Sequence, residues 1–558
     1  MDIDQDILKT MKSVVEGLRT DRLPWWVSWR EIADYYLPQR YVYLMSTSEA
    51  RAQRTQRNAF ILDGTGTMAA RTLASGMMNG ITSPSRPWLR LNIAGQKREE
   101  LSRDALIWLD DVTLRMLLIM AGTNFYNAMA QMYLDLCVFG TAACIIYEDY
   151  RDVFRCYSSP LGEFYLGQSD RQTINIVARE FTYKVRQVVE WFGEENCSQA
   201  TRDAWKRGGA QWNQDVDLTH LIEPNYDTKG KLPGKFAFRE TYWETKSTEP
   251  GKVLSRRGYY EMPGIFPRWE LTSNDSYGTS PGMDALGDVI QLQHETKKKG
   301  QGLDKLIDPP MIADIQLQHK PTALLPRGIT YVAGVNNVGV KPAYQINMPL
   351  NDLSVDIAQV QQRIKETFHN DLFRMISNLD TVRSATEIDA RREEKLVLLG
   401  PVLERFENEA LSPAVRRIYS IVNRADLLPP PPPEIAQMEI EIQYTSILTA
   451  AQTAVATIPI ERWIGLIGSV AGVRPDVLNV PDWDETIRYY GQQLGVPAKL
   501  AVPKEESMQV TNQQHQTAQL QQAVATGGGL AEGAKTLSET DVGGGANALS
   551  KLINPYGA

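Results

Sequence analysis

Apolar positions recur at helical spacing near the start of the chain, which predicts a helix-rich N-terminal part. Two stripes follow the 4, 3, 4 spacing of one face of an amphipathic helix. They are Ile7, Met11, Val14, Leu18 and then Trp25, Trp29, Ile32, Tyr36. Pro24 is favourable at the first position of a helix, so a second helix is expected to begin there and to end before Pro38. Helices are also expected over 104–118 and up to Phe139-Gly140.

Between about residues 145 and 275 the pattern changes to short aromatic and β-branched runs separated by Gly, Pro and Asn, which predicts strands. The runs are 143–147, Phe164–Leu166, Ile174–Val177, Phe236–Trp243 and Gly258–Glu261. One helix, Arg186–Phe192, is expected among them. The fold class that these patterns predict is α+β and helix-rich.

Two long helices are predicted next, each about 40 Å long at roughly 1.5 Å per residue. The first is expected from Pro281 to Ile307, before Asp308-Pro309-Pro310. The second opens near Asn351 or Asp352. Its apolar stripe is Leu353, Ile357, Val360, Ile364, Phe368 and Leu372. The insert between the two helices, 309–349, is predicted to contain short strands.

The remaining chain is punctuated by a capping box, a proline run and glycine clusters. Ser384-Ala385-Thr386-Glu387 predicts the start of a third long helix, kinked at Gly400-Pro401. Ser412-Pro413 is expected to start a separate helix that ends near Arg424. Pro429–Pro433 predicts a stiff linker, 439–444 a strand, and the glycine-rich end, 526–558, a flexible tail.

Composition and charge narrow the classes of protein. The chain has 558 residues, of which 43% are hydrophobic, and a formal net charge of −8. A protein that binds DNA without sequence preference should be basic, because it must neutralise phosphates. The four cysteines lack metal-site spacing and are expected to be buried hydrophobes in a reducing cytoplasm. Neither a signal peptide nor a membrane span is expected.

Candidate chemistry is sparse. Gly64-Thr65-Gly66-Thr67-Met68-Ala69 fits the GxGxxA dinucleotide fingerprint, but no carboxylate follows about 20 residues later to bind a ribose. A helix-opening turn is therefore the favoured interpretation, and a dinucleotide-dependent enzyme is the alternative. The five histidines are dispersed, and we expect no catalytic residue, no metal site and no cofactor.

Two segments could contact nucleic acid. Lys297, Lys298 and Lys299 lie in the first long helix, where a solvated basic face is the favoured interpretation and a phosphate-facing patch the alternative. The loop 377–383, which includes Asn378, Asp380 and Arg383, lies between two long helices and could touch a substrate. The tryptophans near residue 25 are expected to be core anchors rather than platforms for bases.

Six sequence blocks, in order and spacing, resemble the portal (head-to-tail connector) proteins of short-tailed, podovirus-type bacteriophages. The N-terminal block comprises Trp29-x-x-Ile32-x-x-Tyr35-x-x-Pro38, Asp63-Gly64-Thr65-Gly66, Leu73-Ala74-Ser75-Gly76 and the segment Ile81–Trp88. The later blocks are Phe139-Gly140-Thr141, Arg268-Trp269, Tyr277-Gly278-x-Ser280-Pro281-Gly282, Ser384–Glu387 and Leu494–Ala498. The resemblance covers about residues 25 to 515.

The resemblance implies a ring, usually of twelve subunits, at one vertex of the capsid. It implies a wing (1–280), a first stem helix (281–308), a clip (309–349), a second stem helix (350–376) and a channel loop (377–383). A kinked wing helix and its successor (384–428), a linker and crown (429–525) and the tail (526–558) would follow. The apolar stripe of the second stem helix is expected to be buried between subunits.

The function that the resemblance implies is a structural DNA channel through which the viral genome is packaged and ejected. DNA would be held loosely, and Asn378, Asp380, Arg383 and the stem lysines are the candidates to face it. The implied partners are other copies of the chain, double-stranded DNA, the terminase motor, a tail adaptor, and major capsid and scaffolding proteins. The expected location is the virion, after synthesis in the host bacterial cytoplasm. A simple nucleic-acid-binding module is a further alternative, distinguished by salt-dependent affinity for free DNA.

Overall fold

The computed structural model describes residues 5–45, 61–96, 98, 101–226, 236–308, 311–313, 340–342, 349–371, 399–444 and 463–472, with a few positions between 474 and 486 and residue 535. The chain divides into two compact units. Unit 1 comprises Met1–Asn92, Asp111–Pro430 and Ile440–Leu466. Unit 2 comprises Ile93–Asp110, Pro431–Glu439 and Ile467–Ala558. In unit 2, the Ala94 amide donates to the Glu439 carbonyl (2.9 Å), and Arg98 pairs with Asp110.

The N-terminal region is one 32-residue helix, α1 (Gln5–Tyr36), and not the two helices that Pro24 predicted. Pro24 lies inside α1 on its exposed side. Buried contacts on both sides of the proline hold the helix together. The Arg22 guanidinium lies 3.8 Å from the centroid of the Tyr165 ring and donates to the Phe164 carbonyl (2.7 Å). Trp29 is fully buried, as expected for a core anchor, whereas Trp25 is half-buried.

The mixed body is built on a five-stranded antiparallel sheet with the strand order β4-β5-β6-β7-β8. The strands are β4 (Phe164–Gln168), β5 (Ile174–Lys184), β6 (Asp215–Pro224), β7 (Phe238–Glu244) and β8 (Ser255–Tyr259). Leu8, Met11 and Leu18 of α1 pack with Tyr165, Leu221 and Trp243 of the sheet. A second cluster is formed by α6 (Val185–Phe192), α7 (Gln199–Arg207), Leu218 and Tyr242. The helix-rich α+β prediction is confirmed for the described residues.

A smaller sheet joins β3 (Val153–Ser159), β2 (Ala143–Asp149) and β9 (Gly264–Ile265). β1 (Leu89–Ile93) pairs with β12 (Ile440–Tyr444), which confirms the predicted C-terminal strand. The surrounding helices are α3 (Thr65–Ile81), α4 (Arg103–Gly122) and α5 (Phe125–Phe139), with short helical turns η1 (Arg40–Leu44), η4 (Glu194–Asn196) and η5 (Gly209–Asn213). The four cysteines are free and buried, as expected from their number and spacing.

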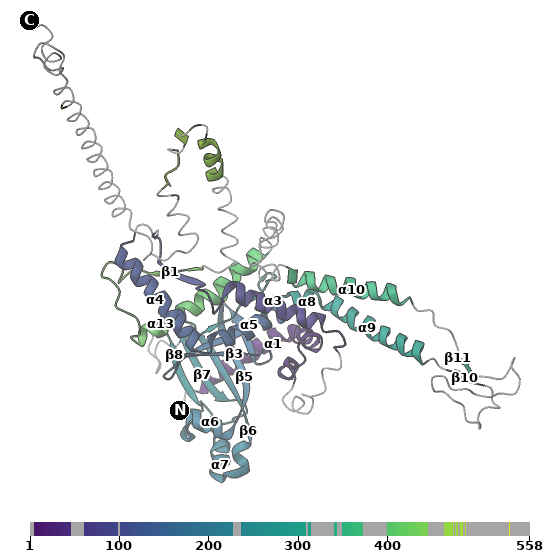
Figure 1. Cartoon of the computed structure of the whole chain (residues 1–558). Helices are drawn as coiled ribbons and strands as arrows, with labels where there is room; N and C mark the ends of the chain where they lie inside the picture. The colour runs from purple at the N-terminus through teal and green to yellow at the C-terminus, as the bar shows by residue number, and fades with distance from the viewer. Residues whose placement is uncertain are drawn as a thin grey trace, which may run out of the picture. The chain divides into compact units, whose positions relative to one another are not determined.

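The two predicted long helices form an antiparallel pair (Figure 1). The first is divided into α8 (Pro281–Asp284) and α9 (Leu286–Ile307). The second, α10 (Leu350–Thr367), has 18 residues and is about 27 Å long, shorter than the 40 Å expected. It ends because His369 adopts a positive φ of 49°, which an α-helix cannot continue. Between the helices, β10 (Met311–Ala313) pairs with β11 (Val340–Pro342).

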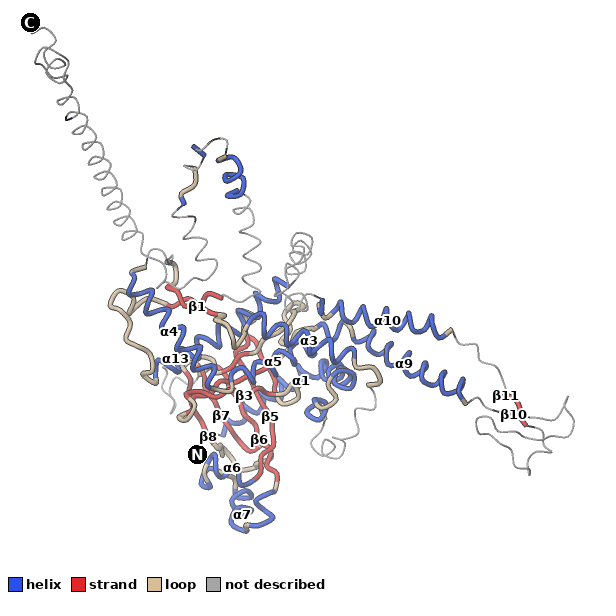
Figure 2. Tube along the Cα trace, in the orientation of Figure 1, coloured by secondary structure: helices blue, strands red, loops and turns tan. Residues whose placement is uncertain are grey.

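The prediction that a separate helix begins at Ser412-Pro413 is wrong. Residues 399–406 are helical and lead without a break through a π-helical segment, η7 (Glu407–Leu411), into α13 (Ser412–Arg424). The irregularity in this helix is therefore a π segment. It leads into α13, which is labelled in Figure 2. Ser384–Glu387 and the channel-loop candidates lie outside the described residues, as does the tail apart from residue 535.

Among the described helices, none combines the length and the apolar character needed to cross a lipid bilayer.

Asp135 provides a pH test of the core. It is buried on α5, with its Oδ1 3.1 Å from the Nε of Arg40, and burial raises its pKa to about 6 although Arg40 opposes the shift. An unfolded aspartate has a pKa near ~3.9, so the folded chain retains this proton to higher pH. The stability from this group is complete below about pH 4 and is lost by about pH 6, a change of roughly 3 kcal/mol.

Asp135→Asn should therefore raise the melting temperature at pH 7.5 relative to wild type and have little effect near pH 4. The measurement is thermal unfolding followed by circular dichroism at both pH values. Asp111→Asn, at a surface ion pair with Arg115, is the control. Equal pH slopes for wild type and Asp135→Asn would contradict this account.

Candidate functional site

Three of the sequence blocks meet at the base of the α8–α9 helix: Asp63–Gly66, Phe139–Thr141 and the segment from Arg268 to Gly282. All of them belong to unit 1. The site that they form has three parts, which we call the glycine corner, the amide clasp and the arginine hub. Together these parts fix the helix pair to the mixed body.

The glycine corner joins the end of α5 to the start of α8. Gly140 has a φ of +78°, and a Cβ at this position would collide with the carbonyl oxygen of Gly278. The Gly278 amide donates to the Thr141 hydroxyl (2.9 Å), and the Ser280 hydroxyl donates to the Val138 carbonyl (2.7 Å). Only glycine permits backbones to approach this closely in the left-handed region. The corner therefore sets where α8 begins relative to α5.

The amide clasp is centred on Gln293 of α9, which is buried. Its Oε1 accepts hydrogen bonds from the backbone amides of Leu62 (2.7 Å) and Asp63 (2.9 Å), and its Nε2 donates to the Asp63 carbonyl (2.8 Å). From α10, the side-chain amide of Gln361 donates to the Asp63 carboxylate (2.8 Å). One short segment before α3 thus binds both helices of the pair.

The Asp63 carboxylate is ionised in this setting. Partial burial alone would raise its pKa, but hydrogen bonds from Thr65 and Gln361 and the charge of Lys365 outweigh that effect and hold the pKa below its ordinary value. The Thr65 amide donates to its Oδ1 (2.8 Å), which satisfies a free N–H at the start of α3.

The close packing around Gly66 explains why the dinucleotide-like motif has a glycine here, and no bound nucleotide is needed to account for it. A Cβ here would lie 3.0 Å from Cγ2 of Val289 and 3.2 Å from the Tyr36 ring, so the glycine lets α3 approach α9 and α1. Residues 61–64 form no strand, and α3 begins at Thr65. The motif is a helix-opening turn, as favoured, and the enzyme alternative has no support.

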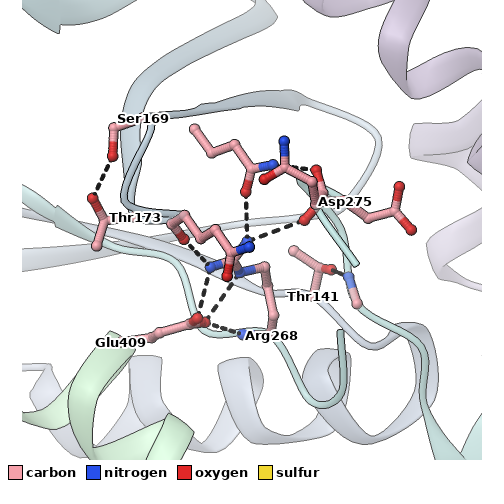
Figure 3. Close-up of polar contacts among 10 residues, drawn as sticks. Thr141, Ser169, Thr173, Arg268, Asp275 and Glu409 are labelled. Atoms are coloured by element: carbon pink, nitrogen blue, oxygen red, sulfur yellow. Dashed lines mark hydrogen bonds and ion pairs between the residues drawn. The ribbon is translucent and has the colours of Figure 1, made fainter. Parts of the chain in front are cut away.

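The arginine hub places a buried guanidinium among several acceptors (Figure 3). Arg268 pairs with Glu409 of η7, its terminal nitrogen 2.7 Å from Oε1 and its backbone amide 2.9 Å from Oε2. The same guanidinium donates to the backbone carbonyls of Gln172 (2.7 Å) and Asp275 (3.1 Å). The hub joins the β4–β5 turn, the approach to α8 and the long helix of residues 399–424.

The arrangement is structural. Its charged groups are satisfied by internal partners, and the described residues contain no group of three or more His, Cys, Asp or Glu side chains placed to hold a metal ion. The site can transmit force between segments and fix the angle at which the helix pair leaves the body.

The predicted DNA-facing residues are only partly described. Lys297 and Lys298 are exposed on α9, and the Lys299 ammonium donates to the Ser354 hydroxyl of α10 (3.0 Å). Asn378, Asp380 and Arg383 of the loop lie outside the described residues, as does Leu372.

The apolar stripe of α10 is buried against other elements of the same chain, and not against a neighbouring subunit as expected. Ile357, Val360, Ile364 and Phe368 are already buried within one chain, and Leu353 is half-buried. Phe368 packs against Tyr36 with ring centroids 5.8 Å apart, and α10 also packs on α9 and α3. The expected burial of this stripe between subunits is therefore corrected to burial inside the subunit.

Comparisons with known proteins agree with the blocks that form this site. Residues 8–501 match the family described as bacteriophage head to tail connecting protein. The chain belongs to this family. A protein of Bordetella phage BPP-1 named "Probable portal protein" is 38% identical over 94% of this chain and 93% of its own length. The "Portal protein" of Salmonella phage epsilon15 is 37% identical over 97% of both chains.

A solved structure also aligns with this connector-family chain. A chain from "Neck of empty GTA particle computed with C6 symmetry" covers 69% of this chain with 10% identity and a TM-score of 0.33. That score is too low to support an argument about the fold.

Sequence reasoning missed several residues of the connector-family site. Asp63 lies in the N-terminal sequence block. Its partners Gln293 and Gln361 belong to helices whose apolar spacing does not single out a glutamine. Glu409 was missed because a π segment has no sequence signature that separates it from an α-helix. The signal closest to it is Arg268 itself, which lies in a sequence block and, once buried, needs acceptors for its donors.

Breaking the arginine hub should destabilise unit 1. Glu409→Gln removes the charge that compensates Arg268, and loss of one partner of a buried ion pair costs roughly 3 kcal/mol. We expect a lower melting temperature and faster hydrogen exchange in residues 407–411. Glu404→Gln, the same change at an exposed position on the same helix, should leave both unchanged. Similar behaviour of the two variants would contradict the hub.

Removing the amide clasp should loosen the helix pair. Gln293→Leu leaves the Leu62 and Asp63 amides and the Asp63 carbonyl without their partner, at a cost of roughly 2–4 kcal/mol. Hydrogen–deuterium exchange at the start of α3 should increase. The matched control is Gln291→Leu, two residues away on the exposed face of α9. If exchange at residues 62–67 is unchanged in Gln293→Leu, Gln293 does not hold this segment.

Proposed function

We propose that the chain is the portal protein of its phage, a structural subunit that assembles into a ring, usually of twelve copies, at one capsid vertex. The observation that supports this proposal is membership of the head-to-tail connecting family across residues 8–501, with relatives named as portal proteins over nearly their full length. The viral genome passes through the ring during packaging and ejection.

The geometry of unit 1 gives this role a physical basis. In the proposal, residues 1–280 with 384–428 form the wing, α9 and α10 form the stem, and 309–349 form the clip between them. Residues 377–383 form the channel loop and 429–525 the linker and crown. The clasp, the corner and the hub tie the stem to the wing at several points, so force on one is carried to the other.

Contacts between copies must use surfaces other than the buried α10 stripe. Val355 of α10 is 57% exposed and Ile307 of α9 is 81% exposed, so both are available for a neighbouring subunit. In the bore, Lys297 and Lys298 are the described candidates to face DNA, with Asn378, Asp380 and Arg383 proposed for the loop. We expect few strong contacts between the bore and the DNA phosphates, because tight binding would stop DNA from sliding.

The remaining assignments follow from the same role. The partners proposed are the terminase motor at the clip during packaging, then a tail adaptor, with major capsid and scaffolding proteins around the wing. The location is the portal vertex of the virion, after synthesis in the host cytoplasm. The protein supplies the wall of the channel, and a separate motor supplies the energy, so no catalytic residue, cofactor or metal is proposed.

The proposal is tested by electron microscopy and native mass measurement of the purified full-length chain. We expect closed rings with a central channel. A strictly monomeric species in every preparation contradicts the proposed function.

The bore is tested separately with Lys297→Glu/Lys298→Glu, which should leave rings intact but alter the yield of packaged DNA several-fold, because it adds repulsion near phosphate. Lys206→Glu, an exposed change on α7, is the control. An unchanged yield would remove these lysines from the proposed bore.

A further inference from the structure

A groove of about 910 Å³ lies on unit 1 and is lined by the β2–β3 hairpin, β8 and α13, of which β3, β8 and α13 are labelled in Figure 1. None of the portal regions discussed above accounts for it. Of its 22 lining residues, six are Tyr, two Phe, one Trp and five Arg. Tyr, Trp and Arg are the residues that carry most of the binding energy in protein interfaces. The composition marks a recognition surface rather than a packing defect.

Large aromatic side chains around this groove are exposed to solvent. Tyr150 at the hairpin tip is fully exposed, and Tyr157, Trp191 and Tyr260 are each 43–46% exposed. Leu427 adds an aliphatic side chain at the rim. Contiguous exposed apolar surface on a folded chain marks an interaction site, because burying it on a partner is favourable.

The polar side chains on the floor of the groove are held in place by hydrogen bonds to one another. Glu240 accepts hydrogen bonds from the Tyr259 hydroxyl (2.9 Å) and the Tyr242 hydroxyl (3.1 Å), and its carboxylate lies 2.8 Å from Nε2 of His220. His220 stacks on the Tyr242 ring with centroids 4.1 Å apart. These contacts hold the shape of the groove and engage the Glu240 carboxylate in hydrogen bonds.

The acids along the walls are also engaged. Glu148 binds Arg424 at 2.6 Å, and Asp149 accepts the Arg151 backbone amide at 2.7 Å within its turn. In contrast, Arg151 and Arg257 are exposed and neither forms a salt bridge with a described residue, although Arg257 lies opposite Glu240 in the sheet and its charge helps to lower the pKa of that carboxyl. The lining therefore has more arginines than acids beside its aromatic surface, although the whole chain is acidic.

The hairpin tip that closes one side is strained. Val153 has a φ of +71°, which is a rare conformation for a β-branched residue. Such strain persists where the surrounding structure enforces it, often at binding sites. Here it follows directly after the turn that presents Tyr150 and Arg151 toward solvent.

We propose that this groove docks an acidic segment of another virion or assembly protein, one that carries an aromatic or large apolar anchor. The anchor inserts among Tyr157, Trp191 and Tyr260, and the acidic side chains pair with Arg151 and Arg257. Charge complementarity favours this partner, because the lining holds five arginines against three acids, and the Arg151 and Arg257 side chains are exposed at its edge. The inference rests on the proposed function and adds a partner surface to it.

The test is complementation of a phage that lacks its portal gene with variants of the full-length chain. Arg151→Glu/Arg257→Glu reverses both exposed charges, and Tyr150→Ala removes the exposed ring without touching the core. Charge reversal in the groove should lower the titre of infectious particles by about 100-fold, because repulsion replaces two charge pairs. Arg207→Glu, on an exposed helix end outside the groove, is the matched control and should grow normally.

Ring formation, checked by electron microscopy, separates this inference from the proposed function. If the wild-type chain forms no rings, the proposed function fails irrespective of the groove. If wild-type and variant rings are alike while the variant titre falls, suppressors that replace an acidic residue of another phage protein support the proposal. Normal titre of both groove variants overturns it.

Three other outcomes also overturn the proposal. Loss of rings in Arg151→Glu/Arg257→Glu, or suppressors within this chain alone, would make the occupant a second copy. Binding of labelled oligo-dT that the wild-type ring shows and the groove variant loses would make the occupant single-stranded nucleic acid, which aromatic and arginine side chains can also bind.

Discussion

The burial of one positive charge, on Arg268, constrains much of unit 1. Its side chain is 1% exposed, and a guanidinium taken out of water must find acceptors for its donors. Those acceptors come from the β4–β5 turn, from the loop before α8 and from Glu409, so all three must be held in place at once. A regular α-helix through 407–411 would place later residues in a different register. The π segment is thus the local conformation that lets Glu409 reach Arg268 while α13 keeps its own packing.

The helix pair is held by a different kind of bond. Gln293 and Gln361 bind the segment before α3 through neutral amides, with the Asp63 carboxylate as the one charged acceptor. Bonds of this kind depend less on salt than exposed ion pairs do, because neutral dipoles are screened less. Close packing at Gly66 and the buried stripe of α10 add an apolar contact to the same junction. The junction of the helix pair with α3 therefore combines apolar packing with hydrogen bonds that change little with ionic strength.

Periodicity predicted most elements, because apolar spacing reports burial directly. It placed α5, α6, β2 and β12 within a few residues, and the sequence blocks marked the glycine corner before its geometry was known. It was wrong at Pro24 and at Ser412-Pro413, where tertiary contacts carry a helix past a residue that usually starts one. The amide clasp could not be predicted, since Gln293 and Gln361 meet their common partner, Asp63, only when segments far apart in the sequence come together. The family resemblance, rather than periodicity, carried the functional prediction.

Some of the carboxylates that make the chain acidic are engaged in internal hydrogen bonds, so the net charge alone does not describe the charge at the surface. The carboxylates of Asp63, Glu240 and Glu244 are met largely by amides, hydroxyls or an imidazole and not by lysine or arginine. Burial lowers the pKa of His220, so that imidazole is neutral and cancels no charge at neutral pH. Part of the net −8 therefore resides in internal hydrogen-bond networks. The field at the surface depends on exposed groups, and on α9 these include Lys297 and Lys298. In the proposed ring, loose holding of DNA would require acidic side chains on the inner surface, and the total charge of the chain does not by itself place them there.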